Sequence, residues 1–197
     1  KHRMPNTQLP PSPFEKQINA EPDLFPWTEG IIRALWDNPW TDKKWTFAPD
    51  VQDYRVNMTE QEQVMFTRSL SAISQIEVAA VKDFWADTKN HFGRPSIGAM
   101  GAVLSNNEIV HYYAYRRALK ELGQFHLYEE NLKVPCIANR VTYLKKHLEK
   151  HYEDKNKQTI YRTVIFALYV ENVSLFSQFY TVNYFNSKRN MMNHTAQ

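Results

Sequence analysis

Three glutamates that interrupt apolar stripes on long predicted helices constrain this chain more than any other feature. Side chains three and four positions apart share one face of a helix, so each stripe marks a face that packs into a core. The stripes are Phe66, Leu70, Ile73, Glu77, Ala80 and Phe84; Ile97, Gly101, Leu104, Glu108, His111, Tyr115, Ala118 and Leu122; and Ile160, Val164, Leu168, Glu171, Leu175, Phe179, Val182 and Phe185. A fold that buries these faces places three carboxylates inside a helical core.

Burying these carboxylates requires compensation. An ionised carboxylate without a partner in a core costs on the order of several kcal/mol, which is comparable with the stability of a whole domain. No lysine or arginine lies on the three stripes, so a metal cation is the compensation we expect. Carboxylates and imidazoles on facing helices hold di-iron or di-manganese centres in four-helix bundles, and Glu108 with His111 has the Glu-x-x-His spacing of such sites.

Local signals divide the chain into helices. Thr59 and Glu62 have the spacing of a capping box, which predicts a helix start, while Gly93 and Pro95 predict a break and Gly123 a C-terminal cap. We therefore expect helices over about 59–90, 96–122, 138–152 and 159–185.

The N-terminal region has a different composition. Residues 1–26 carry six of the ten prolines, which disfavours long helices and predicts an extended arm laid over the body. Residues 38–58 are also expected to be irregular. The remainder, 27–197, reads as one all-α domain, because hydrophobic residues make up 43% of the chain, only 5 residues are glycine and strand-like alternation is scarce.

Charge and hydropathy argue against two classes of partner. The formal charge of +3 is spread along the chain, so we expect no nucleic-acid binding. The most apolar stretch, 163–185, is interrupted by Glu171 and several amides, so we expect no membrane span. A single cysteine, Cys136, suits a reducing cytoplasm, where we expect the protein to act.

Each of these features also has a plainer interpretation. A lone Glu-x-x-His on a helix is more often a surface pair than a ligand set. Glu77 and Glu171 would be surface residues if the helical phase were wrong by one position, which leaves a metal-free helical scaffold open. Tyr115 lies one turn after His111; a buried tyrosine is ordinary, but beside an oxidising metal pair it is a candidate electron donor.

At this point the motifs resemble a known family, the small subunit of class I ribonucleotide reductase. The segments that carry the resemblance are Ser71-Ala72-Ile73-Ser74-Gln75-Ile76-Glu77; Ile97-Gly98-Ala99-Met100-Gly101 leading into Glu108-Ile109-Val110-His111 and Tyr115; and Tyr169-Val170-Glu171-Asn172 followed by Phe179. The 31-residue interval between positions 77 and 108 also matches the family pattern, and the resemblance covers roughly residues 30–190.

The resemblance implies a ferritin-like helical bundle with a dinuclear metal site between its long helices. Glu77, Glu108 and His111 would belong to the first metal, with Glu108 bridging, and Glu171 would ligate the second. Tyr115 matches the radical tyrosine.

The resemblance also implies a redox relay and an enzymatic activity. Trp40 corresponds to the relay tryptophan, with Trp45 as its rival. The implied activity is that of the reductase small subunit: the metal centre activates oxygen and generates a tyrosyl radical, which a separate large catalytic subunit uses to reduce ribonucleotides to deoxyribonucleotides. Iron is the first expectation, with manganese or a mixed pair open, and a homodimer of completed subunits is expected.

Two departures from the family pattern stand out. The first ligand is Glu77 where many relatives have aspartate, which leaves the metal open. The family's second Glu-x-x-His does not occur after Glu171, so we expect a second polypeptide to supply a Glu and a Glu-x-x-His set and to cover the apolar face of 160–185; a shortened chain is the alternative. Another ferritin-like diiron oxidase or an iron-storage protein is the rival function.

Overall fold

The fold is a bundle of helices. A computed structural model describes residues 11–153 and 156–197, and within these ranges it contains helices and loops but no strand. The α-helices are α1 (Trp27–Asp37), α2 (Ala48–Gln52), α3 (Glu60–Ile76), α4 (Asp83–His91), α5 (Pro95–Glu121), α6 (Tyr128–Lys133), α7 (Pro135–Glu153), α8 (Lys157–Tyr169) and α9 (Leu175–Arg189). Shorter π or 3-10 segments are η1 (Asp53–Asn57), η2 (Glu77–Lys82), η3 (Phe125–Leu127) and η4 (Val170–Ser174). The predicted all-α class is confirmed.

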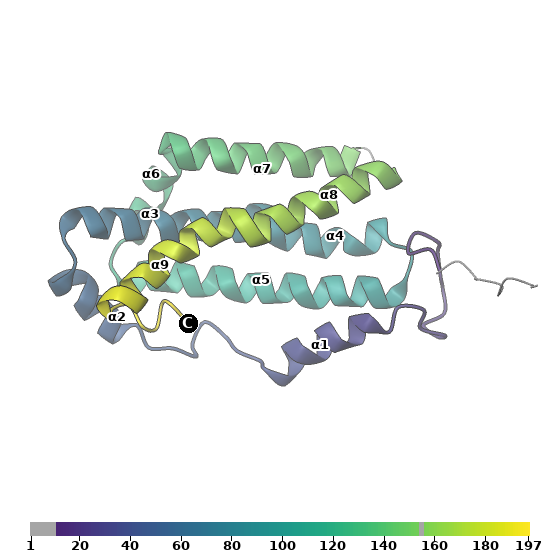
Figure 1. Ribbon diagram of the computed structural model, residues 1–197, viewed down its shortest axis with the longest axis horizontal. Helices are drawn as coiled ribbons and strands as arrows, with labels where there is room; N and C mark the ends of the chain where they lie inside the picture. Colours follow the sequence, from purple (N-terminus) through teal and green to yellow (C-terminus); the bar gives the residue numbers. More distant parts are fainter. Residues whose placement is uncertain (1–10, 154–155) are drawn as a thin grey trace, which may run out of the picture.

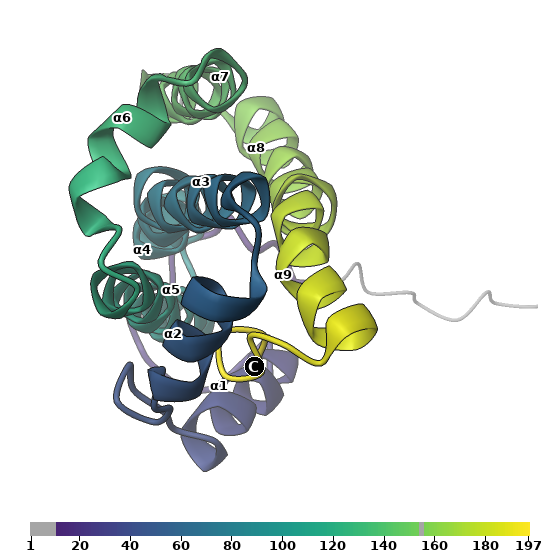
Figure 2. The same ribbon diagram turned by 90° about the vertical axis from the view of Figure 1, so that its left-hand side faces the viewer.

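Three long rods form the centre of the bundle. Residues 60–91 form one continuous rod of α3, η2 and α4; α5 forms the second; and 157–189 form the third from α8, η4 and α9. Helices α3 and α4 pack on α5, and α9 packs on α3, as Figures 1 and 2 show from two directions. Helix α7 covers α8 and part of α3, while α1 lies against α5.

The start of the first rod follows the predicted capping box. The backbone N–H of Thr59 donates to Oε2 of Glu62 at 2.8 Å, and the N–H of Glu62 donates back to the Thr59 hydroxyl at 3.4 Å. This reciprocal pair satisfies two backbone donors that the first turn leaves open. The other long helices also begin and end within a few residues of the predicted positions. The region predicted to be irregular contains α2 and η1, and the helices α1 and α6 were not predicted.

Two of the three rods contain a π-turn at the centre of the bundle. In each, two buried residues stand five positions apart, Ile76 and Val81 in the first rod and Val170 and Leu175 in the third. A π-turn adds one residue to the turn, so an apolar face that continues through it has a five-residue step. The prediction that Leu168 lies on the core stripe is wrong: its side chain is 58% exposed, and the neighbouring Ala167 packs against the core instead.

Helices α4 and α5 approach closely at Gly101. A Cβ atom at this position would lie 2.6 Å from Cβ of Thr88 and 2.7 Å from the carbonyl oxygen of Trp85. Only a residue without a side chain fits there, so Gly101 lets α4 lie directly against α5. Ser105, one turn further along α5, donates its hydroxyl to the carbonyl of Lys82 at the end of η2 at 3.0 Å.

The buried side chains form two clusters. One contains Phe66, Leu119 and Phe185, and the other contains Ile73, Ile76 and Leu175. Tyr115 is partly buried and packs against both clusters. Tyr115 therefore lies where the two clusters meet, and the second cluster surrounds the two π-turns.

The terminal regions of the described chain pack on the bundle through hydrogen bonds. The Gly93 N–H donates to the carbonyl of Pro13, and the Gln17 N–H donates to the carbonyl of Gly93, so the N-terminal segment is tied to the loop between α4 and α5. The first ten residues of the predicted arm lie outside the described residues. Within the described residues, no helix is both long enough and apolar enough to cross a bilayer.

The C-terminal segment, residues 190–197, turns back beneath α9 toward α5 (Figure 2). Its anchor is Asp50 of α2, whose carboxylate is 1% exposed. This carboxylate accepts hydrogen bonds from the His194 N–H at 3.2 Å and from the N–H and hydroxyl of Thr195 at 2.6 Å each. The turn includes left-handed backbone at Asn190 and Met192.

Candidate metal centre

The Glu-x-x-His pair lies on α5 and faces the interior. Glu108 is 7% exposed, and Nδ1 of His111 lies 2.8 Å from Oε2 of Glu108. Residues three positions apart in a regular helix are neighbours on one face, so this contact follows directly from the sequence spacing. The two side chains thus present a carboxylate and an imidazole side by side.

Glu171 approaches the same region from the third rod. It is the second residue of η4, and Trp85 of α4 donates its indole N–H to Oε1 of Glu171 at 3.4 Å. Burial raises the pKa of Glu171 above its ordinary value, and the Glu108 carboxylate raises it further, while the Trp85 hydrogen bond and His111 lower it. Two carboxylates from different rods therefore lie close enough to repel each other, an arrangement that a bound cation would relieve.

One cavity of about 380 Å³ brings the predicted residues together. Glu108, His111, Tyr115 and Glu171 all line it, with Leu175 and Phe179 among its apolar walls. The cavity gathers carboxylates and an imidazole, which are ligand types that iron and manganese accept, and no lysine or arginine is among the described residues that line it. The donor set therefore fits a cation.

Two tryptophans approach the same histidine region from the chain before α2. The Trp40 ring lies against the His111 imidazole, with 5.5 Å between ring centroids. Trp45 lines a smaller neighbouring cavity of about 110 Å³, which Trp40, His111 and Tyr115 also line. Both predicted relay candidates thus lie near Tyr115, and Trp40 is the one that packs on the histidine.

The first predicted ligand falls outside this description. Glu77 begins η2, but its side chain is not among the described ones. Among the described side chains, no three Asp, Glu, His or Cys residues lie close enough together to hold a metal ion. The described donors thus amount to the Glu108 and His111 pair with Glu171 across the cavity.

Sequence reasoning missed two features of this site. One is Trp85, which lies two turns after Glu77 and contacts Glu171 across the bundle. The other is the C-terminal turn, because Thr195, Ala196 and Gln197 line the cavity. The sequence does carry a signal for the two π-turns. Each has two apolar residues five positions apart with a glutamate directly after the first, namely Ile76 and Val81 around Glu77, and Val170 and Leu175 around Glu171.

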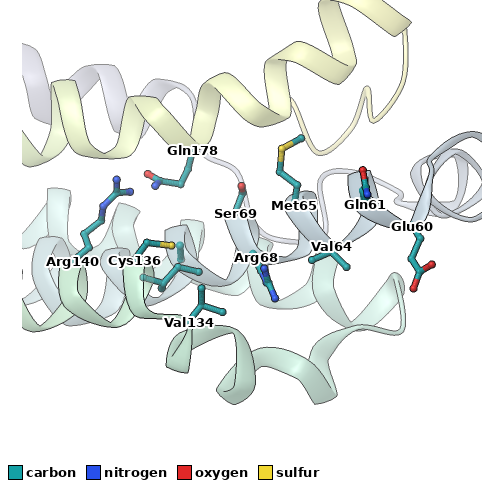
Figure 3. A pocket seen from close by; sticks show the side chains of 12 residues that line it. Glu60, Gln61, Val64, Met65, Arg68, Ser69, Val134, Cys136, Arg140 and Gln178 are labelled. Carbon is teal, nitrogen blue, oxygen red and sulfur yellow. The ribbon is translucent and has the colours of Figure 1, made fainter.

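A larger cavity lies elsewhere in the described part of the chain. It measures about 680 Å³ and lies between α3, α7 and α9, where Figure 3 shows Arg140 and Gln178 facing each other above Cys136. None of the predicted site residues lines it. The candidate centre is therefore identified by its chemistry and not by the size of its cavity.

Comparison with known proteins identifies the family. The family model for the ribonucleotide reductase small chain matches residues 17–197. The chain belongs to the ribonucleotide reductase small-chain family. That match spans every residue assigned to the candidate centre.

The chain is also similar to two individual proteins. The chain is 20% identical over 166 residues to the ribonucleoside-diphosphate reductase subunit beta of Halalkalibacterium halodurans, a match that covers 82% of this chain and 48% of that protein. A crystal structure from Bacillus halodurans, assigned to the class I ribonucleotide reductases, superposes with a TM-score of 0.79 at 20% identity and covers 87% of this chain and 61% of that one. The fold is therefore that of a class I reductase small subunit, and the chain spans about half the length of its curated relative.

Proposed function

We propose that this chain is the radical-generating part of a class I ribonucleotide reductase small subunit. The observation that carries the proposal is the cavity that Glu108, His111, Tyr115 and Glu171 line together. Ferritin-like scaffolds hold dinuclear centres with the same kinds of ligand on facing helices. Family membership supports the same assignment.

The proposed ligands are Glu77, Glu108 and His111 for one metal ion and Glu171 for the other, with Glu108 bridging. The described donors fit this role, since a buried carboxylate, an imidazole and a second carboxylate across the cavity are ligands that iron and manganese accept. When bound, the metal pair would supply the oxidising power that protein side chains lack. We propose iron first, with manganese or a mixed pair as alternatives.

Tyr115 is the proposed radical site. Its ring packs between the two apolar clusters and lines the cavity beside His111, one helical turn away. In forming a neutral radical, the phenol gives up one electron and its proton. Leu175 and Phe179 form an apolar wall of the same cavity, and an apolar surround of this kind excludes the water that would quench a radical.

Trp40 is the proposed relay, because its ring packs on His111. It would carry an electron between the centre and a cysteine in a separate large catalytic subunit, where ribonucleotides are reduced. Trp45 is the rival for this role, as it lines the adjoining cavity.

A further polypeptide segment is part of the proposal, because a two-metal site of this family needs an additional carboxylate and a second Glu-x-x-His. Helices α8 and α9 offer a surface on which such a helix could pack: Ile165, Leu168, Phe176 and Tyr180 are between 50% and 71% exposed. Exposed apolar patches of this kind usually mark interfaces. Intact-mass analysis of the native complex distinguishes a separate polypeptide from a continuation of this one, since a continuation would give a single species much heavier than 23.3 kDa.

Electron paramagnetic resonance of the metal-loaded, oxygen-treated native protein tests the proposal. We expect a tyrosyl signal that disappears in Tyr115→Phe and persists in the control Tyr113→Phe, whose side chain on the same helix is 48% exposed. Both variants should keep their metal, because the ring still packs. Metal binding without any tyrosyl signal would favour another ferritin-like oxidase or an iron-storage protein, and a protein that retains no metal would favour a scaffold.

A further inference from the structure

Trp85 lies outside the proposed ligand set and hydrogen-bonds to Glu171 through its indole N–H. Its Nε1 donates to Oε1 of Glu171 at 3.4 Å, across 86 positions of sequence and between two different rods. The proposed ligands, radical site and relay leave this residue without a role. Its contact with a carboxylate at the cavity makes it a candidate for one.

The backbone around Trp85 fixes the indole in place. Helix α4 lies directly on α5 at Gly101, where the carbonyl of Trp85 itself occupies the space that a Cβ would fill. The adjacent Phe84 is buried and packs edge-to-face on the indole, with 4.9 Å between centroids. The ring also packs against the core cluster that contains Ile76 and Leu175. The donor is therefore held by α4 independently of the position that Glu171 adopts.

An indole N–H has chemical properties that suit this position. It donates one hydrogen bond, accepts none and carries no charge. A lysine or arginine here would neutralise Glu171 and would compete with a metal ion for it. A neutral donor instead restricts the rotation of the carboxylate and leaves its negative charge available to a cation.

We propose that Trp85 is a positioning residue for the metal centre: its indole N–H holds Oε1 of Glu171 and leaves Oε2 as the oxygen available to a metal ion. The inference rests on the proposed function, because it requires Glu171 to be a ligand. Groups that orient metal ligands in this way typically contribute about 10–100-fold to metal affinity or activity.

Cobalt titration of the full native protein tests this role without recourse to enzymatic activity. Co²⁺ affinity is measured by equilibrium dialysis, and the visible absorption of the bound ion reports its coordination. We expect Trp85→Phe to bind Co²⁺ about 10–100-fold more weakly than the unmodified protein and to change its visible spectrum. The matched control, Trp27→Phe, alters a ring that is 56% exposed on α1 and should change neither.

Two further variants separate positioning from packing. Replacing Trp85 by 3-benzothienylalanine keeps the shape of the ring but removes the N–H, so it should weaken Co²⁺ binding as Trp85→Phe does. Because the ring shape is kept, this variant still tests the role of the N–H if Trp85→Phe folds poorly. In a Glu171→Ala background, Trp85→Phe should cause no additional loss, because the residue acts through Glu171.

The outcomes divide cleanly. If the Co²⁺ affinity of the benzothienyl variant lay within about twofold of that of the unmodified protein, the role of Trp85 would be overturned and the metal centre would stand. The same conclusion would follow if Trp85→Phe lowered Co²⁺ affinity in the Glu171→Ala background as much as it does in the unmodified protein. If the unmodified protein itself bound no Co²⁺, the proposed function would fail, and this inference with it.

Discussion

Replacing Gly101 by alanine tests how closely α4 and α5 must pack to form the candidate centre. The added Cβ would lie 2.6 Å from Cβ of Thr88 and 2.7 Å from the Trp85 carbonyl, whereas ordinary contacts begin at 3.4 Å. The difference between 3.4 and 2.6 Å means that the helices would have to separate by about 0.8 Å. Overpacking of a filled core costs about 1–3 kcal/mol. An alanine in a helix also recovers about 0.5–1 kcal/mol relative to glycine, which partly offsets that cost.

A matched glycine-to-alanine substitution corrects for the difference in helix propensity between the two residues. Gly30 lies in α1 with nothing within 4 Å of its Cβ position, so Gly30→Ala gains helix propensity without a clash. We expect Gly101→Ala to be less stable than Gly30→Ala by about 1–3 kcal/mol, or about 2–4 °C in Tm for each kcal/mol in a chain of this size. Urea unfolding and calorimetry of both variants measure the difference. Equal stabilities would refute the close approach of the two helices.

Three further predictions concern the candidate centre and its surroundings. Glu108→Ala or His111→Ala should abolish metal loading while circular dichroism retains most of the helicity; normal metal content in both would remove them from the ligand set. The pKa of Glu171 is raised in the folded state above its ordinary value of 4.5, so the folded protein binds that proton more tightly than the unfolded chain. In the metal-free protein, the contribution of Glu171 to the free energy of unfolding is therefore fully present below pH 4.5 and is lost as pH rises through the raised pKa. Glu171→Gln should remove this contribution from unfolding curves recorded across that pH range. An unchanged dependence of stability on pH in Glu171→Gln would count against it. Asp50→Asn should lower the free energy of unfolding by about 1–3 kcal/mol and speed hydrogen exchange at the Thr195 amide, because the Asp50 carboxylate accepts three hydrogen bonds from the C-terminal turn. Unchanged exchange at Thr195 would show that other contacts hold the turn.

Local spacing predicted the parts of this molecule that lie within one regular helix. The contact between Glu108 and His111 needs only a three-residue interval on α5, and the capping box at Thr59 needs only its neighbours, so both follow from the sequence. The stripe on α5 needs no correction for the same reason: Ile97 and Ala118, near its two ends, are buried.

The features that the sequence did not predict depend on irregular turns or on contacts between rods. The π-turn η4 buries Val170 and Leu175 five residues apart, and a stripe drawn with a regular helical period does not allow a five-residue step. The hydrogen bond from Trp85 to Glu171 joins α4 to η4. The spacing of residues along one helix does not indicate which residue of another helix will face them. The anchoring of the C-terminal turn by Asp50 is a tertiary contact of the same kind.

Anomalous scattering at the iron and manganese edges, from crystals of the full native protein with every segment that completes the site, tests the central claim most directly. We predict two peaks in the cavity that Glu108, His111 and Glu171 line, both within bonding distance of these side chains. The edge at which they appear identifies the metal. A cavity without anomalous signal, in which a basic side chain from the completing segment pairs with the two glutamates, would contradict the account.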